Sequence, residues 1–281
     1  MHDTFRKLSK EQLRQMLGSI PNEADYKAAP AEEVELLDET DIPKEFDARQ
    51  QWPYCRSIRL IRDQANCGSC WAVSAASVMS DRVCIATYGI VQPYISDENI
   101  LSCCTSGGHG CHGGDPLSAF KYWKQGIPNG GPYNTTNGCQ PYTKCWEGCP
   151  GGTPACMGHK CIPEFPYSYN SSLYYGATWY WIQSMERAQQ DIMKYGPIDA
   201  TFHVYEDLYY YKSGVYKHTT GKHEGSHAVR VIGWGEENGV PYWLITNSWG
   251  PYWGDNGLFK ILRGQDECAI ESYLTTGTST L

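Results

Sequence analysis

The stretch Gln64-Ala65-Asn66-Cys67-Gly68-Ser69-Cys70-Trp71 decides how the rest of the chain is interpreted. Small residues surround Cys70, and an Ala/Val/Ser-rich run follows it, for which we predict a helix over about 70–86. A thiol in the first turn of a helix lies at the positive end of the helix dipole, which favours thiolate over thiol. Because the thiolate is the nucleophilic form, this stretch predicts an activated Cys70.

Composition and cysteine content indicate a protein of the secretory pathway. The chain has 281 residues and a formal net charge of −8, and residues 1–41 hold 10 acidic and 5 basic residues. Without a basic patch, this charge argues against nucleic-acid binding, and no apolar run is long enough to span a bilayer. Thirteen cysteines and the sequons at Asn134 and Asn170 indicate an oxidising compartment. No apolar signal region follows Met1, so we expect a form from which the signal has been removed.

Spacing alone leaves two other roles open for the cysteines. The Cys67-x-x-Cys70 pair also fits a redox dithiol, and the cluster from Cys145 to Cys161 also fits zinc. A disulfide suits Cys67 better in a chain with thirteen cysteines and two sequons, and the cluster lacks two C-x-x-C pairs. We therefore predict neither a metal nor a cofactor.

Residues 1–41 differ from the rest of the chain. Apolar residues follow helical spacing up to Pro21, which ends the predicted helix: Phe5, Leu8, Leu13, Met16, Leu17 and Ile20. A Pro/Ala/Glu-rich stretch follows, with six carboxylates: Glu32, Glu33, Glu35, Asp38, Glu39 and Asp41. Two interpretations are open. One is a disordered tail, and the other is a propeptide with a docking helix and an extended part that lies along a cleft.

The pattern changes from helices to strands along the remaining chain. Residues 103–165 are rich in Cys, Gly and Pro, which indicates loops held by disulfides, with a short helix near 117–124. A second helix is predicted at 185–195, where Gly-Pro follows. Strands are predicted at 198–204, 227–234, 242–247 and 258–262, with a hairpin turn at Glu237-Asn238-Gly239. A helical half beside a β half predicts a cleft between them, where ligand sites are common.

These motifs together resemble the cathepsin B-like enzymes of the papain family of cysteine proteases, and among them those of parasitic nematodes. The motif around Cys70 fits the papain pattern C-G-[SA]-C-[WY]. Further matching stretches are Phe46-Asp47-Ala48-Arg49, Ser80-Asp81-Arg82-Val83-Cys84, Tyr211-Lys212-Ser213-Gly214-Val215-Tyr216 and Trp253-Gly254-Asp255-Asn256-Gly257.

The resemblance implies an α+β, papain-like fold of two lobes with the active-site cleft between them. The helical left lobe would lie mainly over 60–165, and a β-barrel-like right lobe mainly over 166–281. The peptidase domain would span 42–281, preceded by a partial propeptide at 1–41. In this family the propeptide runs through the cleft in the reverse direction and blocks it.

The resemblance also implies a Cys–His–Asn site. His227 opens an apolar strand; alone, such a histidine is more often structural, but beside the cysteine motif it is the candidate base. The Asn247 amide oxygen would fix the imidazole tautomer, and Trp249 would cover that hydrogen bond. The Gln64 side-chain N–H and the Cys70 backbone N–H would form the oxyanion hole. The alternative for Asn247 is a turn residue beside core tryptophans.

Substrate-binding residues and disulfides are carried over from the same family. Substrate would contact Gly113, Gly114, Asp115, Pro116, Ala228, Trp249 and Tyr273. The bridges would be Cys55–Cys84, Cys67–Cys111, Cys103–Cys156, Cys139–Cys161 and Cys145–Cys149. Cys70, Cys104 and Cys268 remain, and we expect Cys104 to be free or differently paired. The sequon residues Asn134 and Asn170 are the predicted glycosylation sites.

Two departures from the family bear on specificity. The occluding loop of cathepsin B carries adjacent histidines that bind a substrate's C-terminal carboxylate and give dipeptidyl carboxypeptidase activity. Here the gap between Cys145 and Cys149 holds three residues and no histidine, so we predict mainly an endopeptidase. The histidine that could replace the missing ones is His159, which is nearby in the sequence. The family's S2 glutamate aligns with Tyr273, which predicts hydrophobic P2 residues over Arg. The nearest acid, Glu271, is expected to face away on the strand.

We therefore predict a cysteine endopeptidase made as a zymogen, with protein and peptide substrates. Its own propeptide and cystatin-type inhibitors would inhibit it, and no nucleic acid or membrane partner is expected. The acidic residues between 32 and 41 predict faster activation at acidic pH. We expect a monomer that is lysosomal or extracellular, in a gut lumen if the nematode resemblance holds. The alternative is a catalytically silent papain-fold binding or matrix protein.

Overall fold

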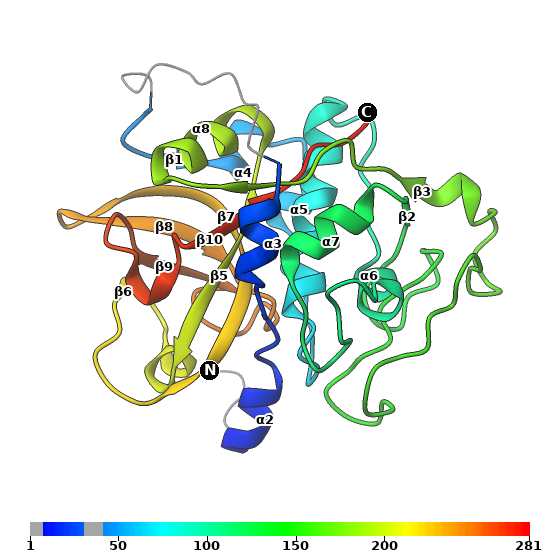
Figure 1. The fold of residues 1–281 in the computed structure, drawn as a ribbon, viewed down its shortest axis with the longest axis horizontal. Helices are drawn as coiled ribbons and strands as arrows, with labels where there is room; N and C mark the ends of the chain where they lie inside the picture. Colours follow the sequence, from blue (N-terminus) through cyan, green and yellow to red (C-terminus); the bar gives the residue numbers. More distant parts are fainter. Residues whose placement is uncertain (1–7, 31–41) are drawn as a thin grey trace.

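Two lobes meet along a central helix. The computed structural model describes residues 8–30 and 42–281 (Figure 1). One lobe carries α5 (Cys70–Ala86), α6 (Asp97–Cys103) and α7 (Pro116–Trp123), and the other is built on a sheet. Each lobe has an apolar core, with Trp71, Phe120 and Trp123 in the first and Phe202, Trp243 and Phe259 in the second. The predicted α+β fold of two lobes is confirmed.

The position of α5 between the lobes explains its composition. Every residue from Cys70 to Cys84 is buried, so the helix has small residues all round instead of one apolar stripe. Asp81 pairs with Arg230 of the sheet at 2.7 Å, and Arg82 pairs with Asp191 of α8 (Met185–Tyr195). Buried charges are stable only when they are paired. The two pairs therefore fix the rotation of α5, and with it the position of its first residue.

The sheet forms the second wall of the cleft. Its order is β4-β10-β5-β7-β8-β9-β6, and β1 pairs with β7. The bounds are β1 (Phe46–Asp47), β4 (Tyr180–Ile182), β5 (Ile198–Tyr205), β6 (Val215–Tyr216), β7 (His223–Glu237), β8 (Val240–Thr246), β9 (Leu258–Leu262) and β10 (Tyr273–Thr276). Within the described residues the outer strands β4 and β6 do not pair with each other, so the sheet is open. The β-barrel-like right lobe is therefore wrong, because these end strands of three and two residues are too short to close the sheet.

Most of the predicted elements are confirmed, with small shifts at their ends. The helices α5 and α8 and the strand β9 have the predicted bounds, whereas β7 extends beyond 227–234 at both ends. Asn238 and Gly239 have φ values of 52° and 79°, as a two-residue hairpin turn requires. The remaining elements are α4 (Ala48–Gln51), β2 (Ile127–Pro128), β3 (Leu173–Tyr174), η2 (Arg56–Arg59), η3 (Asn170–Ser172), η4 (Glu206–Tyr210) and η5 (Glu267–Ala269).

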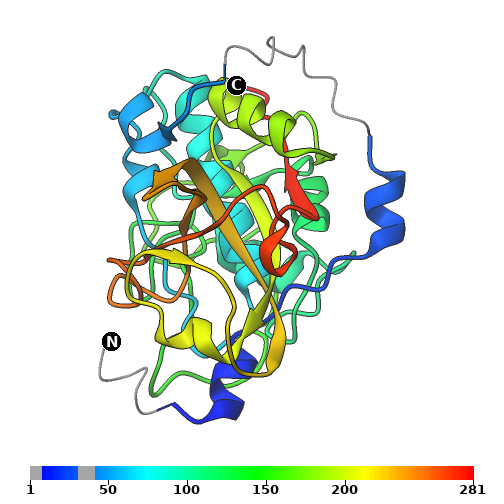
Figure 2. The same cartoon turned by 90° about the vertical axis from the view of Figure 1, so that its left-hand side faces the viewer.

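An N-terminal segment (residues 8–30) crosses both lobes, along one side of the molecule (Figures 1 and 2). It contains α2 (Lys10–Gln15), which Ser9 caps, and α3 (Glu23–Ala28), which Asn22 caps. The predicted amphipathic helix is confirmed over α2 alone; Phe5 and the six carboxylates between 32 and 41 lie outside the described residues. The helix α3 was not predicted, because six residues show too little periodicity.

Five disulfides hold the helical lobe and its loops. They join Cys55–Cys84, Cys67–Cys111, Cys103–Cys156, Cys139–Cys161 and Cys145–Cys149, the pairs that the family resemblance implies. Cys70, Cys104 and Cys268 are free. Cys104 is buried, with its sulfur 3.8 Å from the Ser118 carbonyl oxygen. The Cys67-x-x-Cys70 pair is therefore no dithiol, and the cysteines of the 145–161 cluster are in disulfides.

Candidate active site

Cys70 is the first residue of α5 and is fully buried. Its Sγ accepts a hydrogen bond from the Gly18 backbone N–H at 3.3 Å. Burial raises the pKa of the Cys70 thiol to about 12, against the lowering by the backbone N–H groups of Ala228 and Gly18. The thiol is thus the favoured form while the N-terminal segment lies on the sulfur, and the thiolate stays a prediction for the open site. Burial, with the N-terminal segment lying on the sulfur, outweighs the helix dipole.

His227 of β7 and Asn247, directly after β8, face each other. Their Nε2 and Oδ1 atoms are 2.8 Å apart, and both residues are buried. An amide oxygen accepts, so Nε2 carries the imidazole proton and Nδ1 has the lone pair. Within the described residues Nδ1 has no hydrogen-bond partner. Burial lowers the pKa of His227 to about 4, so the imidazole is neutral here.

An indole covers this pair. The Trp249 ring lies 4.7 Å from the His227 ring at an angle of 32°. Asn247 is held in turn by the Ser248 N–H, which donates to its Oδ1 at 2.8 Å. The cover and the second hydrogen bond exclude water and restrict rotation of both side chains.

Gln64 is fully buried. Its Nε2 donates to the Cys67 carbonyl at 2.7 Å and to the Met16 carbonyl at 2.8 Å. Its Oε1 accepts from the Ser248 hydroxyl at 2.6 Å, which fixes the orientation of the amide. A carbonyl of the N-terminal segment therefore already lies against the predicted oxyanion donor.

The N-terminal segment continues along the two glycines after the motif. The Gly114 N–H donates to the Gly18 carbonyl at 2.9 Å, and the Ile20 N–H donates to the Gly114 carbonyl at 2.8 Å. These bonds form a parallel bridge between Ser19 and Gly114. Gly18 is required here, because a Cβ on it would lie 1.9 Å from the Gly68 carbonyl oxygen. A Cβ on Gly114 would lie 2.5 Å from the Trp71 ring.

Tyr273, at the start of β10, lies against an aromatic residue of the N-terminal segment. The Tyr26 ring is 5.2 Å from the Tyr273 ring, edge to face, and 6.0 Å from the Trp181 ring. Tyr26 is 1% exposed, so its side chain fills a pocket beside Tyr273 and Trp181. An aromatic side chain is thus accommodated beside Tyr273.

Two buried acids adjoin this pocket. Asp115 caps α7, accepting from the Leu117 N–H at 3.1 Å, and Pro116 is the first residue of that helix. Burial raises the pKa of Asp115 to about 6 and raises that of the fully buried Asp199 well above its ordinary value. Below about pH 6 both acids are protonated in this form and offer no salt bridge, whereas Asp115 ionises above that pH.

Glu271 does not lie on a strand, contrary to expectation. It precedes β10 in a tight turn, where it accepts from the Gly264 N–H at 2.6 Å, the Asp266 N–H at 2.9 Å and the Trp243 Nε1–H at 2.9 Å. The turn around residues 264–271 uses its carboxylate as an internal acceptor. Ser272 and Tyr273 follow, so the strand begins later than expected.

The short loop between Cys145 and Cys149 is held against the rest of the molecule. The Trp146 Nε1–H donates to Asp63 Oδ2 at 2.8 Å, and the Lys144 ammonium donates to the Pro150 carbonyl at 2.9 Å. Asp63 pairs with Trp249 in an antiparallel bridge, which ties the loop to the cover of His227. His159, the predicted substitute histidine, stacks on the Tyr169 ring at 5.1 Å.

The structure brings residues to the site that sequence reasoning missed. Ser248 orients Gln64, Asp199 lies near the Tyr273 pocket, and Tyr142 contacts the Gln64 carbonyl. Only Ser248 had a local signal, since it follows Asn247 directly. The sequon residues Asn134 and Asn170 are both exposed. Among the described residues no group of His, Cys, Asp and Glu could hold a metal ion, and no helix is both long and apolar enough to cross a membrane.

Comparison with known proteins gives the class of protein. The model of the Papain family cysteine protease matches residues 42–278, so the chain belongs to the papain family of cysteine proteases. Its N-terminal segment is matched as well by a solved proenzyme, proCathepsin B S9 from Trypanosoma congolense. That structure covers 98% of this chain and 90% of its own, at 36% identity and a TM-score of 0.83.

Within the family, the similar curated proteins are cathepsin B-like. Cathepsin B-like cysteine proteinase 4 of Caenorhabditis elegans is 46% identical over 256 residues, covering 86% of this chain and 76% of its own. The gut-specific cysteine proteinase of the same nematode is 47% identical over 263 residues, covering 90% and 79%. The chain is thus a cathepsin B-like cysteine protease, and the likeness to a procathepsin indicates a zymogen.

Proposed function

We propose that the chain is a cysteine endopeptidase whose nucleophile is Cys70, with His227 as the base, Asn247 as its orienting partner and Gln64 in the oxyanion hole. One observation supports this most strongly. A peptide backbone already lies on the site, with the Gly18 N–H on Cys70 Sγ and the Met16 carbonyl on Gln64 Nε2. A site that holds a peptide in this way is suited to peptide hydrolysis.

In the first half of the reaction, the thiol proton passes to His227 Nδ1, the nitrogen that has no other partner in the described structure. The Cys70 thiolate then attacks the scissile carbonyl carbon, and the carbonyl oxygen becomes an oxyanion. The Gln64 Nε2–H and the Cys70 N–H donate to this oxyanion. The amine leaves with the proton from His227, which gives an acyl-enzyme on the Cys70 sulfur.

In the second half, His227 takes a proton from water, and the hydroxide attacks the acyl carbon. The thiolate leaves and the acid product departs. Asn247 accepts from Nε2 throughout at 2.8 Å, so the ring presents Nδ1 in both halves. A neutral partner leaves the imidazolium–thiolate pair net neutral once the site is open.

Labelling with an epoxysuccinyl inhibitor separates this proposal from a silent papain-fold binding protein. We expect the activated chain to be labelled at Cys70, and Cys70→Ala to lose both labelling and peptide hydrolysis. A chain that binds peptides without labelling or turnover would be the silent protein.

The short Cys145–Cys149 loop supports endopeptidase action. It carries no histidine to bind a C-terminal carboxylate, and Trp146 is bonded to Asp63. We expect little dipeptide release from free-acid peptides. Strong release that C-terminal amidation abolishes would contradict this proposal.

A preference for hydrophobic P2 residues is supported by the pocket beside Tyr273, in which Tyr26 lies. We expect a Phe-Arg fluorogenic substrate to be cleaved faster than an Arg-Arg one, because Tyr273 and Trp181 offer apolar contacts to an aromatic side chain and no salt bridge to arginine. The reverse order would overturn the preference.

We further propose that residues 1–41 are part of the propeptide and residues 42–281 the peptidase domain. The parallel bridge of Ser19 with Gly114 supports a reversed path, since a substrate would pair antiparallel there. N-terminal sequencing after activation tests the boundary, and a mature N-terminus before residue 31 would contradict it.

The disulfides and exposed sequons support a secretory-route protein, lysosomal or extracellular, with glycans on Asn134 and Asn170. The name of the gut-specific relative favours a gut lumen. Glycosidase treatment of the secreted chain tests the glycans, and an unchanged mass would refute them. Cystatin-type inhibition and a monomeric state are expected and are tested by titration with a cystatin and by sedimentation. A dimer, or full activity in excess cystatin, would contradict them.

A further inference from the structure

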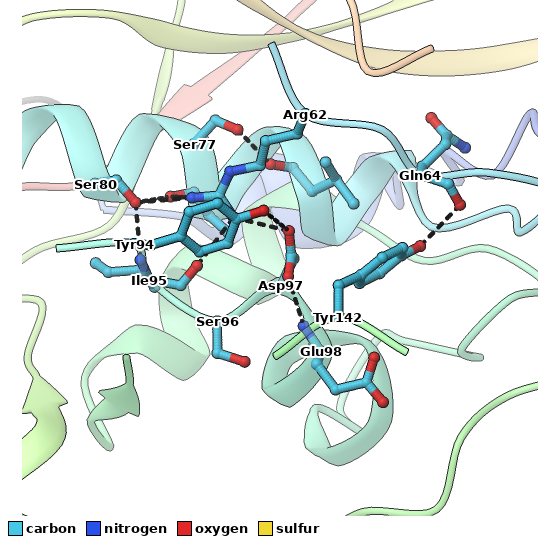
Figure 3. A network of polar contacts seen from close by, with 12 residues as sticks. Arg62, Gln64, Ser77, Ser80, Tyr94, Ile95, Ser96, Asp97, Glu98 and Tyr142 are labelled. Carbon is cyan, nitrogen blue, oxygen red and sulfur yellow. Dashed lines mark hydrogen bonds and ion pairs between the residues drawn. The ribbon is translucent and has the colours of Figure 1, made fainter. Parts of the chain in front are cut away.

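Tyr142 lies beneath the proposed oxyanion hole, although it belongs to the cysteine-rich loops. It lies between Cys139 and Cys145 in the sequence, inside the loop that the Cys139–Cys161 disulfide closes. Its side chain is only 3% exposed and packs in the core of the helical lobe. Its hydroxyl points to the backbone of Gln64 (Figure 3).

This hydroxyl joins two backbone segments that flank the site. It donates to the Gln64 main-chain carbonyl at 2.9 Å, and Ser69 Oγ lies 2.6 Å from it. A phenol has one proton, so the Ser69 hydroxyl donates to Tyr142 and Tyr142 donates to Gln64. The Tyr142 hydroxyl thus connects Ser69, the residue before Cys70, to Gln64, which carries the amide donor. We call this chain of two hydrogen bonds the brace.

Ser69 departs from the usual behaviour of its position. It is the N-cap of α5, where a serine hydroxyl normally accepts from an N–H of the first turn. No such hydrogen bond from the side chain is present, although the Ser69 carbonyl accepts from the Ala72 and Val73 N–H groups as an N-cap carbonyl does. The hydroxyl is thus used for the contact with Tyr142 rather than for capping.

The turn that carries Gln64 needs contacts from outside. Ala65 has a φ of 53°, in the left-handed region that costs a residue with a Cβ energy. Ser248 holds Gln64 from the sheet lobe through both its hydroxyl and its carbonyl. Tyr142 holds it from the helical lobe. A turn that is strained by itself is therefore fixed from both sides.

We propose that Tyr142 is a positioning residue of the oxyanion hole, whose hydroxyl sets the spacing between the Gln64 amide and the Cys70 N–H. This inference rests on the proposed function of those two donors. Donors aimed at an oxyanion act mainly in the transition state. A loosened brace therefore lowers kcat and leaves KM nearly unchanged.

The experiment compares Tyr142→Phe and Ser69→Ala with the matched control Tyr122→Phe. Tyr122 donates to Asn99 Oδ1 at 3.1 Å in the same lobe, without contacting the Gln64 turn. Each full chain is activated by the same treatment with an aspartic protease. We expect kcat to fall about tenfold in Tyr142→Phe and less in Ser69→Ala, with KM within about twofold. The control keeps both constants.

Two further measurements separate positioning from general damage. A peptidyl aldehyde, which forms a tetrahedral adduct on Cys70, binds about tenfold more weakly to Tyr142→Phe. Alkylation of Cys70 by iodoacetamide forms no oxyanion and keeps its rate. In a Gln64→Ala background, Tyr142→Phe lowers kcat by about twofold or less. The Gln64 amide is then absent, so its spacing from the Cys70 N–H no longer affects the oxyanion.

The inference is overturned if Tyr142→Phe behaves like Tyr122→Phe, or if its tenfold loss persists in the Gln64→Ala background. An equal loss in the iodoacetamide rate would overturn it too, since the damage would then lie at the thiol. A failure of the proposed function would give a different result. In that case Gln64→Ala and Cys70→Ala would both keep full activity. Loss of activity in these two with none in Tyr142→Phe refutes the role of Tyr142 alone.

Discussion

The two ends of the N-terminal segment bind to the rest of the molecule in different ways. At the α2 end, Lys10 pairs with Glu206 at 2.6 Å and Arg14 pairs with Glu224 at 2.5 Å. The Lys10 and Arg14 side chains are 74% and 52% exposed, whereas that of Glu224 is 1% exposed. At the α3 end, Tyr26 is enclosed by Trp181 and Tyr273 beside the buried acids. Exposed ion pairs stabilise little, whereas burial of an aromatic ring stabilises much.

The two ends also respond to pH in opposite directions. The hydrogen bond from Lys10 lowers the pKa of Glu206, so that contact is present above the ordinary carboxyl pKa and is lost as pH falls through the lowered one. Burial raises the pKa of Asp115 to about 6, so docking there is favoured at low pH and weakens as pH rises through about 6. The contact at Glu206 is thus weakened by low pH, whereas the contact near Asp115 is weakened by high pH.

Removal of the Tyr26 ring is expected to weaken docking of the N-terminal segment more than any other change. Tyr26→Ala leaves a cavity between Trp181 and Tyr273 and costs about 3 kcal/mol of docking, or about a hundredfold in affinity. The measurement is the inhibition constant of a synthetic peptide of residues 8–30 toward the activated enzyme. A loss below about threefold would show that the α3 end contributes little.

Docking is also expected to change the number of bound protons, and the direction of this change distinguishes the two ends. Asp115→Asn keeps the cap of α7, because Asn caps about as well as Asp, but it cannot titrate. We expect docking of the 8–30 peptide on the Cys70→Ala domain to take up about half a proton near pH 6 and more near pH 5, and Asp115→Asn to abolish most of this uptake. Calorimetry in two buffers of different ionisation enthalpy measures it. Proton release on docking would reverse the assignment of the two ends.

The ion pair at the α2 end has the smallest expected effect. Glu224→Gln removes the partner of Arg14 and weakens docking by less than about fivefold at low salt, and the difference fades as salt rises. Glu236→Gln, at the far end of the same strand β7, is the control. The inhibition constant at two salt concentrations decides the point. A large, salt-independent loss would place the main binding energy at α2 instead.

The residues proposed for catalysis were predictable from local patterns. Cys70 and Gln64 belong to one short stretch, whereas His227 lies on a strand and Asn247 directly follows one, and the apolar character of both strands is evident. The helix α5 was predictable for the same reason, since its small residues run without a break to Ala86. Local composition is a sufficient guide where a residue's role depends on its own element.

The remaining features depend on contacts between distant segments. Tyr142 reaches the Gln64 carbonyl across 78 positions of sequence, and its own loop carries no pattern for this. The neutral state of Cys70 arises from its burial, and Gly18, 52 residues earlier, contacts its sulfur. The open sheet follows from the brevity of β4 and β6. None of these can be derived from spacing or periodicity, because each requires the folded arrangement of both lobes.

We propose Cys70 as the nucleophile and infer that the N-terminal segment keeps it as a buried, neutral thiol. Alkylation by iodoacetamide, followed by peptide mapping to separate Cys70 from Cys104 and Cys268, tests it most directly. In the full chain, burial raises the Cys70 pKa to about 12, and we expect alkylation to be at least about a hundredfold slower than after activation. Equal rates at Cys70 before and after removal of the segment would contradict the account.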